Sequence, residues 1–156
     1  MRNPGGRGAA LGCLATIAVA DFVIKRRRPR WIVAGMFDHP AHLATAILIR
    51  PTPTKAYLAG SLLPDLDHVP LALGPVHPSP DDPRPLTHCL MMVVPAAVLS
   101  RDLAAGMLAH FARDLGVGTG VPLLWPATTR SIRIPYAAYA VACLLLAGRA
   151  NLVDGL

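Results

Sequence analysis

Apolar residues fall into six runs along the chain, and short polar or proline-rich segments separate these runs. The runs lie at about residues 8–24, 38–50, 56–63, 86–99, 103–114 and 136–147. None of them alternates between apolar and polar positions as a half-buried strand does, whereas their lengths suit short helices. The pattern predicts an all-α fold, an antiparallel bundle of about four core helices with one further apolar helix at each end.

Helix start and stop signals divide the runs. Asp38 is expected to cap the first core helix, with Pro40 in its first turn. The serine or the aspartate of the turn at 100–102 is expected to cap the fourth core helix. The segment PTPTK at 51–55 breaks the chain, and the prolines between residues 69 and 85 exclude a helix there and predict an extended loop.

The composition is more apolar than that of a typical soluble domain. Hydrophobic residues make up 53% of the chain and charged residues 15%, against about 25% charged in an average soluble domain. The basic stretch KRRRPR follows the first apolar run, which is typical of an uncleaved membrane anchor with a cytoplasmic basic flank. We interpret residues 1–35 as an apolar anchor with its basic run and residues 36–156 as a helical domain. The alternative is that Met36 is the true start.

The core runs are short for a membrane protein. A helix of twelve residues is about 18 Å long, and the hydrocarbon core of a bilayer is about 30 Å thick. The apolar character of residues 89–99 and 136–147 on all sides nevertheless favours contact with lipid or full burial. We expect a multi-pass protein of the inner (plasma) membrane with short or partly inserted helices and membrane lipids as partners. No nucleic acid is expected, because no aromatic residues interleave the basic run.

Histidines and aspartates fall at helix ends that such a bundle brings together. In an up-down-up-down arrangement, the starts of the first and third core helices lie beside the ends of the second and fourth. This end gathers seven residues: His42, Asp65, Asp67, His68, His88, His110 and Asp114. Every acidic residue of the chain is an aspartate, so any carboxylate chemistry must use Asp.

Imidazoles and carboxylates together are typical of a divalent metal site. Zn²⁺ or Mn²⁺ suits this set, and the number of candidate ligands allows one ion or two. A single pair such as His110 and Asp114, four residues apart, is also common as an ion pair on a helix surface. PDLDH at 64–68 is also compatible with a capped turn, so the metal prediction depends on all seven residues lying together. The three cysteines form no CxxC motif, which does not favour a thiolate zinc site.

Five segments, AHLATAI, GSLLPDLDH, RPLTHCL, HFARD and GVPLLWP, resemble in sequence and order the YdjM-like (DUF457) family of membrane-bound, predicted metal-dependent hydrolases. The resemblance covers residues 38–126. It implies a bacterial inner-membrane helical protein with a divalent-metal site, and the seven residues above stand at matching positions. Pro83-Arg84-Pro85 replaces the His-Arg-Gly pattern usual in the family, which leaves open a degenerate site or one completed by His39 or His77.

The expected function is hydrolysis of an ester or phosphoester at the membrane surface. In this interpretation Asp67 is a general base or bridges a second ion, Arg84 stabilises an oxyanion at the rim, and Thr87 orients a ligand through an outer hydrogen bond. The excess of basic residues at this end places the site on the cytoplasmic side. The alternative is a non-catalytic small membrane scaffold or partner-binding protein whose polar helix ends only cap the bundle.

Overall fold

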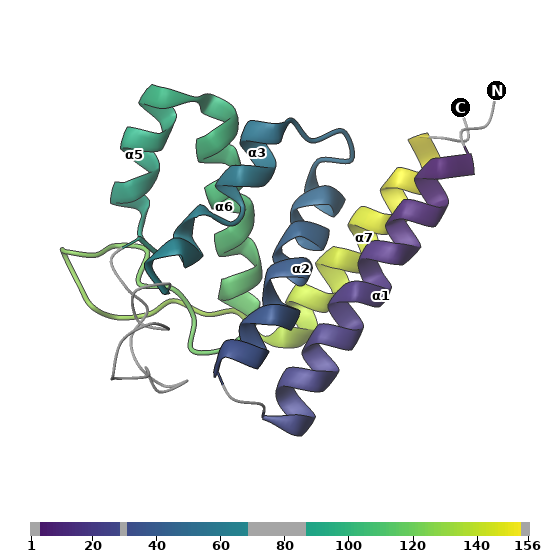
Figure 1. Cartoon of the computed structure of the whole chain (residues 1–156), viewed down its shortest axis with the longest axis horizontal. Coiled ribbons are helices and arrows are strands. Elements are labelled where there is room, and N and C mark those ends of the chain that lie inside the picture. The colour runs from purple at the N-terminus through teal and green to yellow at the C-terminus, as the bar shows by residue number, and fades with distance from the viewer. Residues whose placement is uncertain (1–3, 29–30, 69–86, 154–156) are drawn as a thin grey trace.

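The computed structural model describes residues 4–28, 31–68 and 87–153, which form six α-helices and one 3-10 helix with no β-strand among them (Figure 1). The elements are α1 (Pro4–Arg27), α2 (Trp31–Ile49), α3 (Lys55–Gly60), η1 (Leu63–Asp67), α5 (Leu90–Leu99), α6 (Arg101–Gly116) and α7 (Tyr136–Val153). The all-α prediction is confirmed for this part of the chain.

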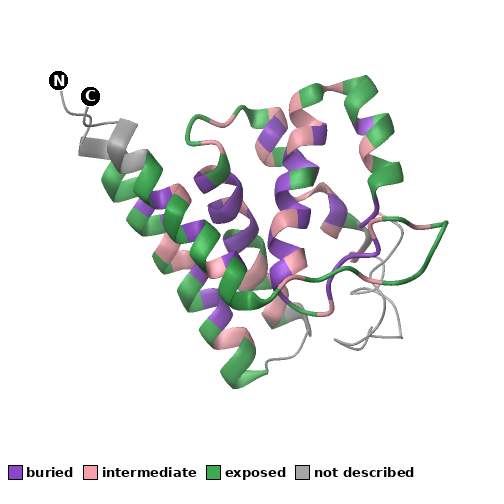
Figure 2. Ribbon diagram, turned by 180° about the vertical axis from the view of Figure 1, so that it is seen from behind, coloured by how far each residue is buried: buried purple, intermediate pink, exposed green. Residues whose placement is uncertain are grey.

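Helix α6 lies at the centre of the molecule and contacts α2, α3, α5 and α7. More than half of its residues are buried. Helices α1 and α7 pack side by side along one flank, whereas α5 lies on the opposite side of α6 and α3 crosses the N-terminal half of α6 (Figures 1 and 2). The outer helices α1, α5 and α7 leave much of their surface exposed, so the interior of the protein is built around α6 and α2 (Figure 2).

Helix α2 begins at Trp31, seven residues before the predicted cap, and Pro40 lies inside it. The N-cap predicted at Asp38 is therefore wrong. Residues 31–37 are almost entirely apolar, and Phe37 packs against the same core cluster as α1 and α7. This packing favours helix on the N-terminal side of Pro40, although proline provides no N–H for the helical hydrogen bond. The side chain of Asp38 consequently lies along a helix instead of at its end.

The other boundaries shift by a few residues. The second predicted helix divides into α3 and η1, the third begins at Leu90, and the fourth continues past Asp114 to Gly116. The turns at residues 51–55 and 100–102 lie together, at the end of the bundle opposite the clustered histidines. A hydrogen bond joins them, from Arg50 Nη1 to Asp102 Oδ1 at 2.6 Å. Ser100 caps α6 by accepting a hydrogen bond from the backbone of Leu103, as expected.

One helix among the described residues is long and apolar enough to cross a bilayer. It covers Arg7–Arg27, 21 residues, which corresponds to about 31 Å of helix. The apolar segments Leu90–Leu99 and Tyr136–Arg149 are shorter. This finding gives weak evidence for one membrane span, and the described residues do not support the multi-pass arrangement expected from the sequence.

Two glycines allow α3 and α6 to cross at backbone contact. A side chain on Gly106 would overlap the carbonyl of Tyr57, and one on Gly60 would overlap the carbonyl of Leu103. Contact this close brings Ser61, the residue that follows α3, against α6. The segment that continues into η1 is therefore fixed relative to the C-terminal half of α6.

Gly106→Ala is expected to destabilise the protein by about 1–3 kcal/mol, because the added methyl group pushes α3 away from α6. Gly12→Ala in α1 is the matched control, since a methyl group there meets nothing within 4 Å. That change is expected to stabilise the helix by up to about 1 kcal/mol. Thermal unfolding in detergent, followed by circular dichroism, measures both effects. Equal melting temperatures for the two variants would contradict the close crossing.

Candidate metal centre

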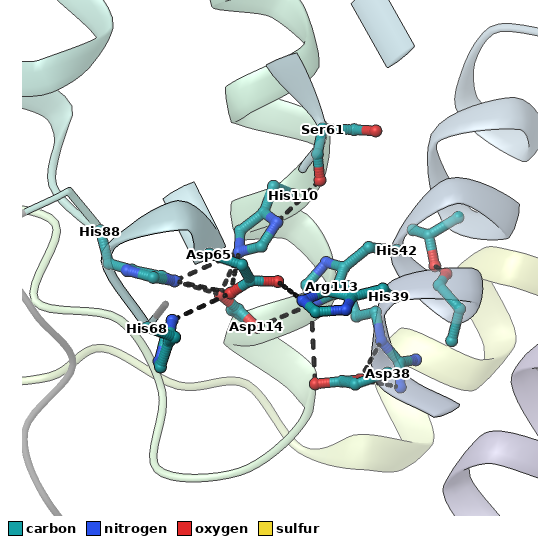
Figure 3. Close-up of polar contacts among 12 residues, drawn as sticks. Asp38, His39, His42, Ser61, Asp65, His68, His88, His110, Arg113 and Asp114 are labelled. Atoms are coloured by element: carbon teal, nitrogen blue, oxygen red, sulfur yellow. Dashed lines mark hydrogen bonds and ion pairs between the residues drawn. The ribbon is translucent and has the colours of Figure 1, made fainter. Parts of the chain in front are cut away.

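Six of the seven predicted ligands converge on one buried cluster between α2, η1, the start of α5 and the C-terminal half of α6 (Figure 3). The six are His42, Asp65, His68, His88, His110 and Asp114. Four of them, the histidines at 42, 88 and 110 and the aspartate at 114, are at most 1% exposed. Residues that are 72 positions apart in the sequence therefore share one site, which is the arrangement that the helix-end argument predicted.

The carboxylate of Asp114 lies among three imidazoles. Its Oδ2 is 3.0 Å from His110 Nε2 and 3.6 Å from His88 Nε2, and its Oδ1 is 3.5 Å from His42 Nε2. The two oxygens thus face different histidines. A carboxylate placed in this way has the geometry to bind one ion or to bridge two.

Asp65 forms a second focus of the same cluster. Its Oδ1 lies 3.5 Å from both His68 Nδ1 and His88 Nε2, and 3.6 Å from His110 Nε2. The other oxygen, Oδ2, lies 3.3 Å from Nε2 of His39, whose side chain is half exposed. Two groups of three side chains therefore have ligand atoms close enough to share an ion: His42 with His110 and Asp114, and Asp65 with His68 and His88.

Hydrogen bonds on the outer side of two rings fix where their protons lie. His110 Nδ1 is 2.8 Å from the carbonyl oxygen of Ser61, which only accepts, so Nδ1 carries the proton and Nε2 keeps its lone pair. The Thr87 hydroxyl donates to the carbonyl oxygen of Pro64 at 2.9 Å and therefore accepts from His88 Nδ1 at 3.2 Å. In the neutral rings both Nε2 lone pairs face the cluster, as metal-ligating histidines require.

The two Nε2 atoms of His88 and His110 are only 3.2 Å apart. Two neutral acceptors at this distance repel each other, and the oxygens of Asp65 and Asp114 beside them add negative charge. A cation between these atoms removes the repulsion.

Loop residues hold His88 in place, because Leu90, at the start of α5, donates its backbone N–H to the carbonyl of Leu123 at 2.9 Å. The segment GVPLLWP, residues 120–126, therefore positions α5.

His42 is fully buried, and neither of its ring nitrogens has a hydrogen-bond partner among the described residues. Burial, and then the ring of His110 stacked on it at 3.8 Å between centroids, lower the pKa of His42 below its ordinary value. The imidazole is therefore neutral at physiological pH. A buried neutral imidazole without a partner is costly for the folded protein, and ligation of an ion satisfies it.

The carboxylate of Asp65 is ionised. Burial opposes ionisation of Asp65, but the hydrogen bond from His39 and the surrounding imidazoles hold the pKa of its carboxyl well below its usual range. The same hydrogen bond raises the pKa of His39. The cluster therefore offers carboxylate oxygens together with imidazole nitrogens, a donor set that fits Zn²⁺ or Mn²⁺.

The sequence interpretation missed two residues beside the cluster. Asp38 Oδ2 lies 3.7 Å from His42 Nε2, and Asp38 Oδ1 accepts hydrogen bonds from Arg113. A signal for Asp38 was present, because it precedes His42 by four positions, the same spacing as His110 and Asp114. Its assignment as a helix cap hid that signal. Arg113 offered no signal, since an arginine near the end of a helix is normally solvated.

The remaining predicted residues are placed in part. Thr87 lies 3.2 Å from Nδ1 of His88, and its predicted role in orienting a ligand stays a prediction. The side chain of Asp67 lies outside the described part of the structure, and so do Arg84 and His77. Their predicted roles as base, oxyanion stabiliser and substitute ligand stay predictions.

No family model, no curated protein and no solved structure matches this chain. The case for a metal centre therefore depends on the geometry of the cluster and on the chemistry of its side chains.

His110→Ala and Asp114→Asn are each expected to reduce the metal content of the purified protein to background, because each removes a ligand from the centre of the cluster. Inductively coupled plasma mass spectrometry measures the bound metal. Asp102→Asn is the matched control, as it changes the same residue type in the same helix at the opposite end, beside Arg50. Metal content that stays the same in both site variants would show that the ligands are wrongly assigned.

Chelation of the metal is expected to lower the melting temperature, and addition of Zn²⁺ or Mn²⁺ to restore it. An ion that binds only the folded state stabilises it by about 2.7 kcal/mol at one hundred times its Kd. The melting temperature of Asp114→Asn should not respond to either treatment. A wild-type protein that melts at one temperature with chelator and with metal would argue against the centre.

Proposed function

We propose that the protein is a membrane-bound metal-dependent hydrolase that acts on an ester or phosphoester at the membrane surface. We also propose that it belongs to the YdjM-like family of the bacterial inner membrane. One observation carries the proposal: four imidazoles and two carboxylates, from segments far apart in the sequence, converge in a single cluster where lone pairs face one another.

The ligand set supports either one ion or two. His42, His110 and Asp114 would hold one ion, and Asp65, His68 and His88 the other. A divalent ion in such a site supplies a bound water of lowered pKa and positive charge for a developing oxyanion. Asp114 belongs to the first group, and its Oδ2 also lies 3.6 Å from His88 Nε2 of the second group, so its removal is expected to affect both.

His39 is the residue of the described part best placed to move a proton. Its side chain is 49% exposed, and its Nε2 is hydrogen-bonded to the carboxylate of Asp65. This contact orients the ring at the rim of the cluster and favours its protonated form. In the proposed reaction, protonated His39 keeps its Nε2–H on Asp65, donates its other ring proton, from Nδ1, to the leaving oxygen and takes one from water afterwards.

Three apolar surfaces support attachment to a membrane. Helix α1 has the length and hydropathy of one span, and α5 exposes large side chains such as Val98 and Leu99, at 83% and 80%. Helix α7 likewise exposes Leu144 and Leu145. Soluble proteins rarely leave so much apolar surface in contact with water. We propose that α1 spans the bilayer and that α5 and α7 contact lipid.

The proposed orientation follows from charge. Basic residues fill the last turn of α1, at the same end as the metal cluster. Positive residues beside a span favour the cytoplasmic side. The centre would then face the cytoplasm near the headgroups, where a lipid-linked or otherwise amphiphilic ester is accessible.

The proposed activity is tested with the wild-type protein in detergent, loaded with Zn²⁺ or Mn²⁺ and given p-nitrophenyl esters and phosphoesters in mixed micelles. We expect metal-dependent release of p-nitrophenol that Asp114→Asn abolishes and Asp102→Asn retains. His39→Gln is expected to retain the metal but to lower kcat, by about 10²-fold or more if it acts as the general acid.

Other outcomes contradict the proposal. Protein that binds metal but hydrolyses neither substrate class would favour the non-catalytic scaffold. Equal rates for wild type and Asp114→Asn would assign the activity to a contaminant.

A further inference from the structure

Arg113 is a fully buried arginine, and every nitrogen of its guanidinium donates a hydrogen bond. Nε and Nη2 both donate to Asp38 Oδ1, at 2.9 and 2.6 Å. Nη2 also donates to Asp21 Oδ1 at 2.9 Å. Nη1 donates to the Tyr139 hydroxyl at 3.1 Å. The four residues come from four different helices, α6, α2, α1 and α7. We call them the arginine cluster.

The partners of Arg113 are themselves held in place. Tyr136 donates its hydroxyl hydrogen to Asp21 Oδ2 at 2.7 Å. The Thr45 hydroxyl donates to the carbonyl of Ala41 and so accepts from the Tyr139 hydroxyl at 2.8 Å. Burial alone would lower the pKa of Arg113, but the carboxylates beside it raise the pKa well above its usual range. The cluster is therefore charged and hydrogen-bonded throughout.

The arginine cluster adjoins the metal centre at two points. Arg113 directly precedes the ligand Asp114 on α6. Asp38 gives one oxygen to Arg113 and turns the other, Oδ2, toward His42 Nε2 at 3.7 Å. A shift of the guanidinium would therefore move the carboxylate of Asp38, which faces His42.

Stability alone does not explain why these charges are buried. Well-packed apolar residues in place of a buried ion pair are often as stable or more so. A guanidinium, in contrast, has a rigid planar fork that fixes the direction of several acceptors at once. This property suits a group that must hold side chains in one geometry.

We propose that Arg113 and Asp21 are positioning residues of the metal centre, and that α1 is a structural part of that centre in addition to being its membrane anchor. Asp21 fixes the guanidinium, the guanidinium fixes Asp38, and Asp38 places its Oδ2 beside Nε2 of His42, the nitrogen that would bind the ion. This inference rests on the metal centre of the proposed function. It adds that a residue in the first helix, outside the ligand set, controls how the ion is bound.

The test uses the full-length protein in detergent with Co²⁺ as a spectroscopic probe, because its visible absorption reports ligand geometry. Asp21→Asn keeps the shape of the side chain and removes its charge. We expect Co²⁺ affinity to fall by about 10- to 100-fold, as is typical when an outer partner of a ligand is lost. We also expect a changed Co²⁺ spectrum, with the helical circular dichroism unaltered.

Asp102→Asn is the matched control, since Asp102 also pairs with an arginine, Arg50, but at the far end of the bundle. It should leave the Co²⁺ affinity and spectrum unchanged. Arg113→Lys retains the charge but not the fork, so it should weaken Co²⁺ binding as Asp21→Asn does. If Asp21→Asn fails to fold, Tyr139→Phe, which removes one hydroxyl, is expected to weaken Co²⁺ binding by about fivefold.

The outcomes separate this inference from the proposed function. Wild-type protein that binds no Co²⁺ overturns the metal centre itself. A second outcome is that the wild-type protein binds Co²⁺ and that Asp21→Asn (or Tyr139→Phe in its place) binds it with the same affinity and spectrum. This outcome overturns the positioning role but not the metal centre. Weaker binding and an altered spectrum in these variants but not in Asp102→Asn support the inference.

Discussion

The structure depends on one close arrangement of acceptor atoms, in which imidazole nitrogens lie beside the carboxylates of Asp65 and Asp114. His88 and His110 direct their Nδ1 protons outward, to a hydroxyl and to a carbonyl. Their Nε2 atoms consequently face each other and the oxygens of Asp65 and Asp114. Positive charge between buried groups of this kind, from an ion or a proton, stabilises them. The rest of the fold brings these groups together and holds them there.

Each part of the bundle serves this arrangement differently. Helix α6 carries two of the candidate ligands, His110 and Asp114, through the middle of the molecule. The glycine crossing with α3 presses the Ser61 carbonyl against His110, and the loop after α6 holds the first turn of α5 through Leu123. Backbone contacts therefore hold His110 and the start of α5, and these two parts of the candidate centre lie on rigid elements of the fold.

The sequence was informative about the ligands and less so about their surroundings. His110 and Asp114 could be found because their spacing places them on one helix face, and the histidines at other helix ends could be placed by topology alone. Asp38 was misassigned because Pro40 beside it resembles a first-turn proline, and only tertiary packing shows that α2 starts earlier. Arg113 could not be found, because its burial depends on Asp21, 92 positions away, and local pattern carries no information at that distance. The pattern of apolar runs also led to the expectation of several membrane spans, whereas one described helix has the length and hydropathy of a span.

The ligand set also has a consequence for electrostatic balance. The described ligand groups contribute two carboxylates, Asp65 and Asp114, and imidazoles that carry no charge when they bind an ion. Beside them, Asp38 and Asp21 share the single positive charge of Arg113, and a protonated His39 pairs with Asp65, so these outer charges add to zero. A single divalent cation would leave the pocket with no net charge. Two such cations would leave a surplus of two positive charges in a poorly solvated space, and a doubly charged anion such as a phosphate monoester would then be the natural counterion.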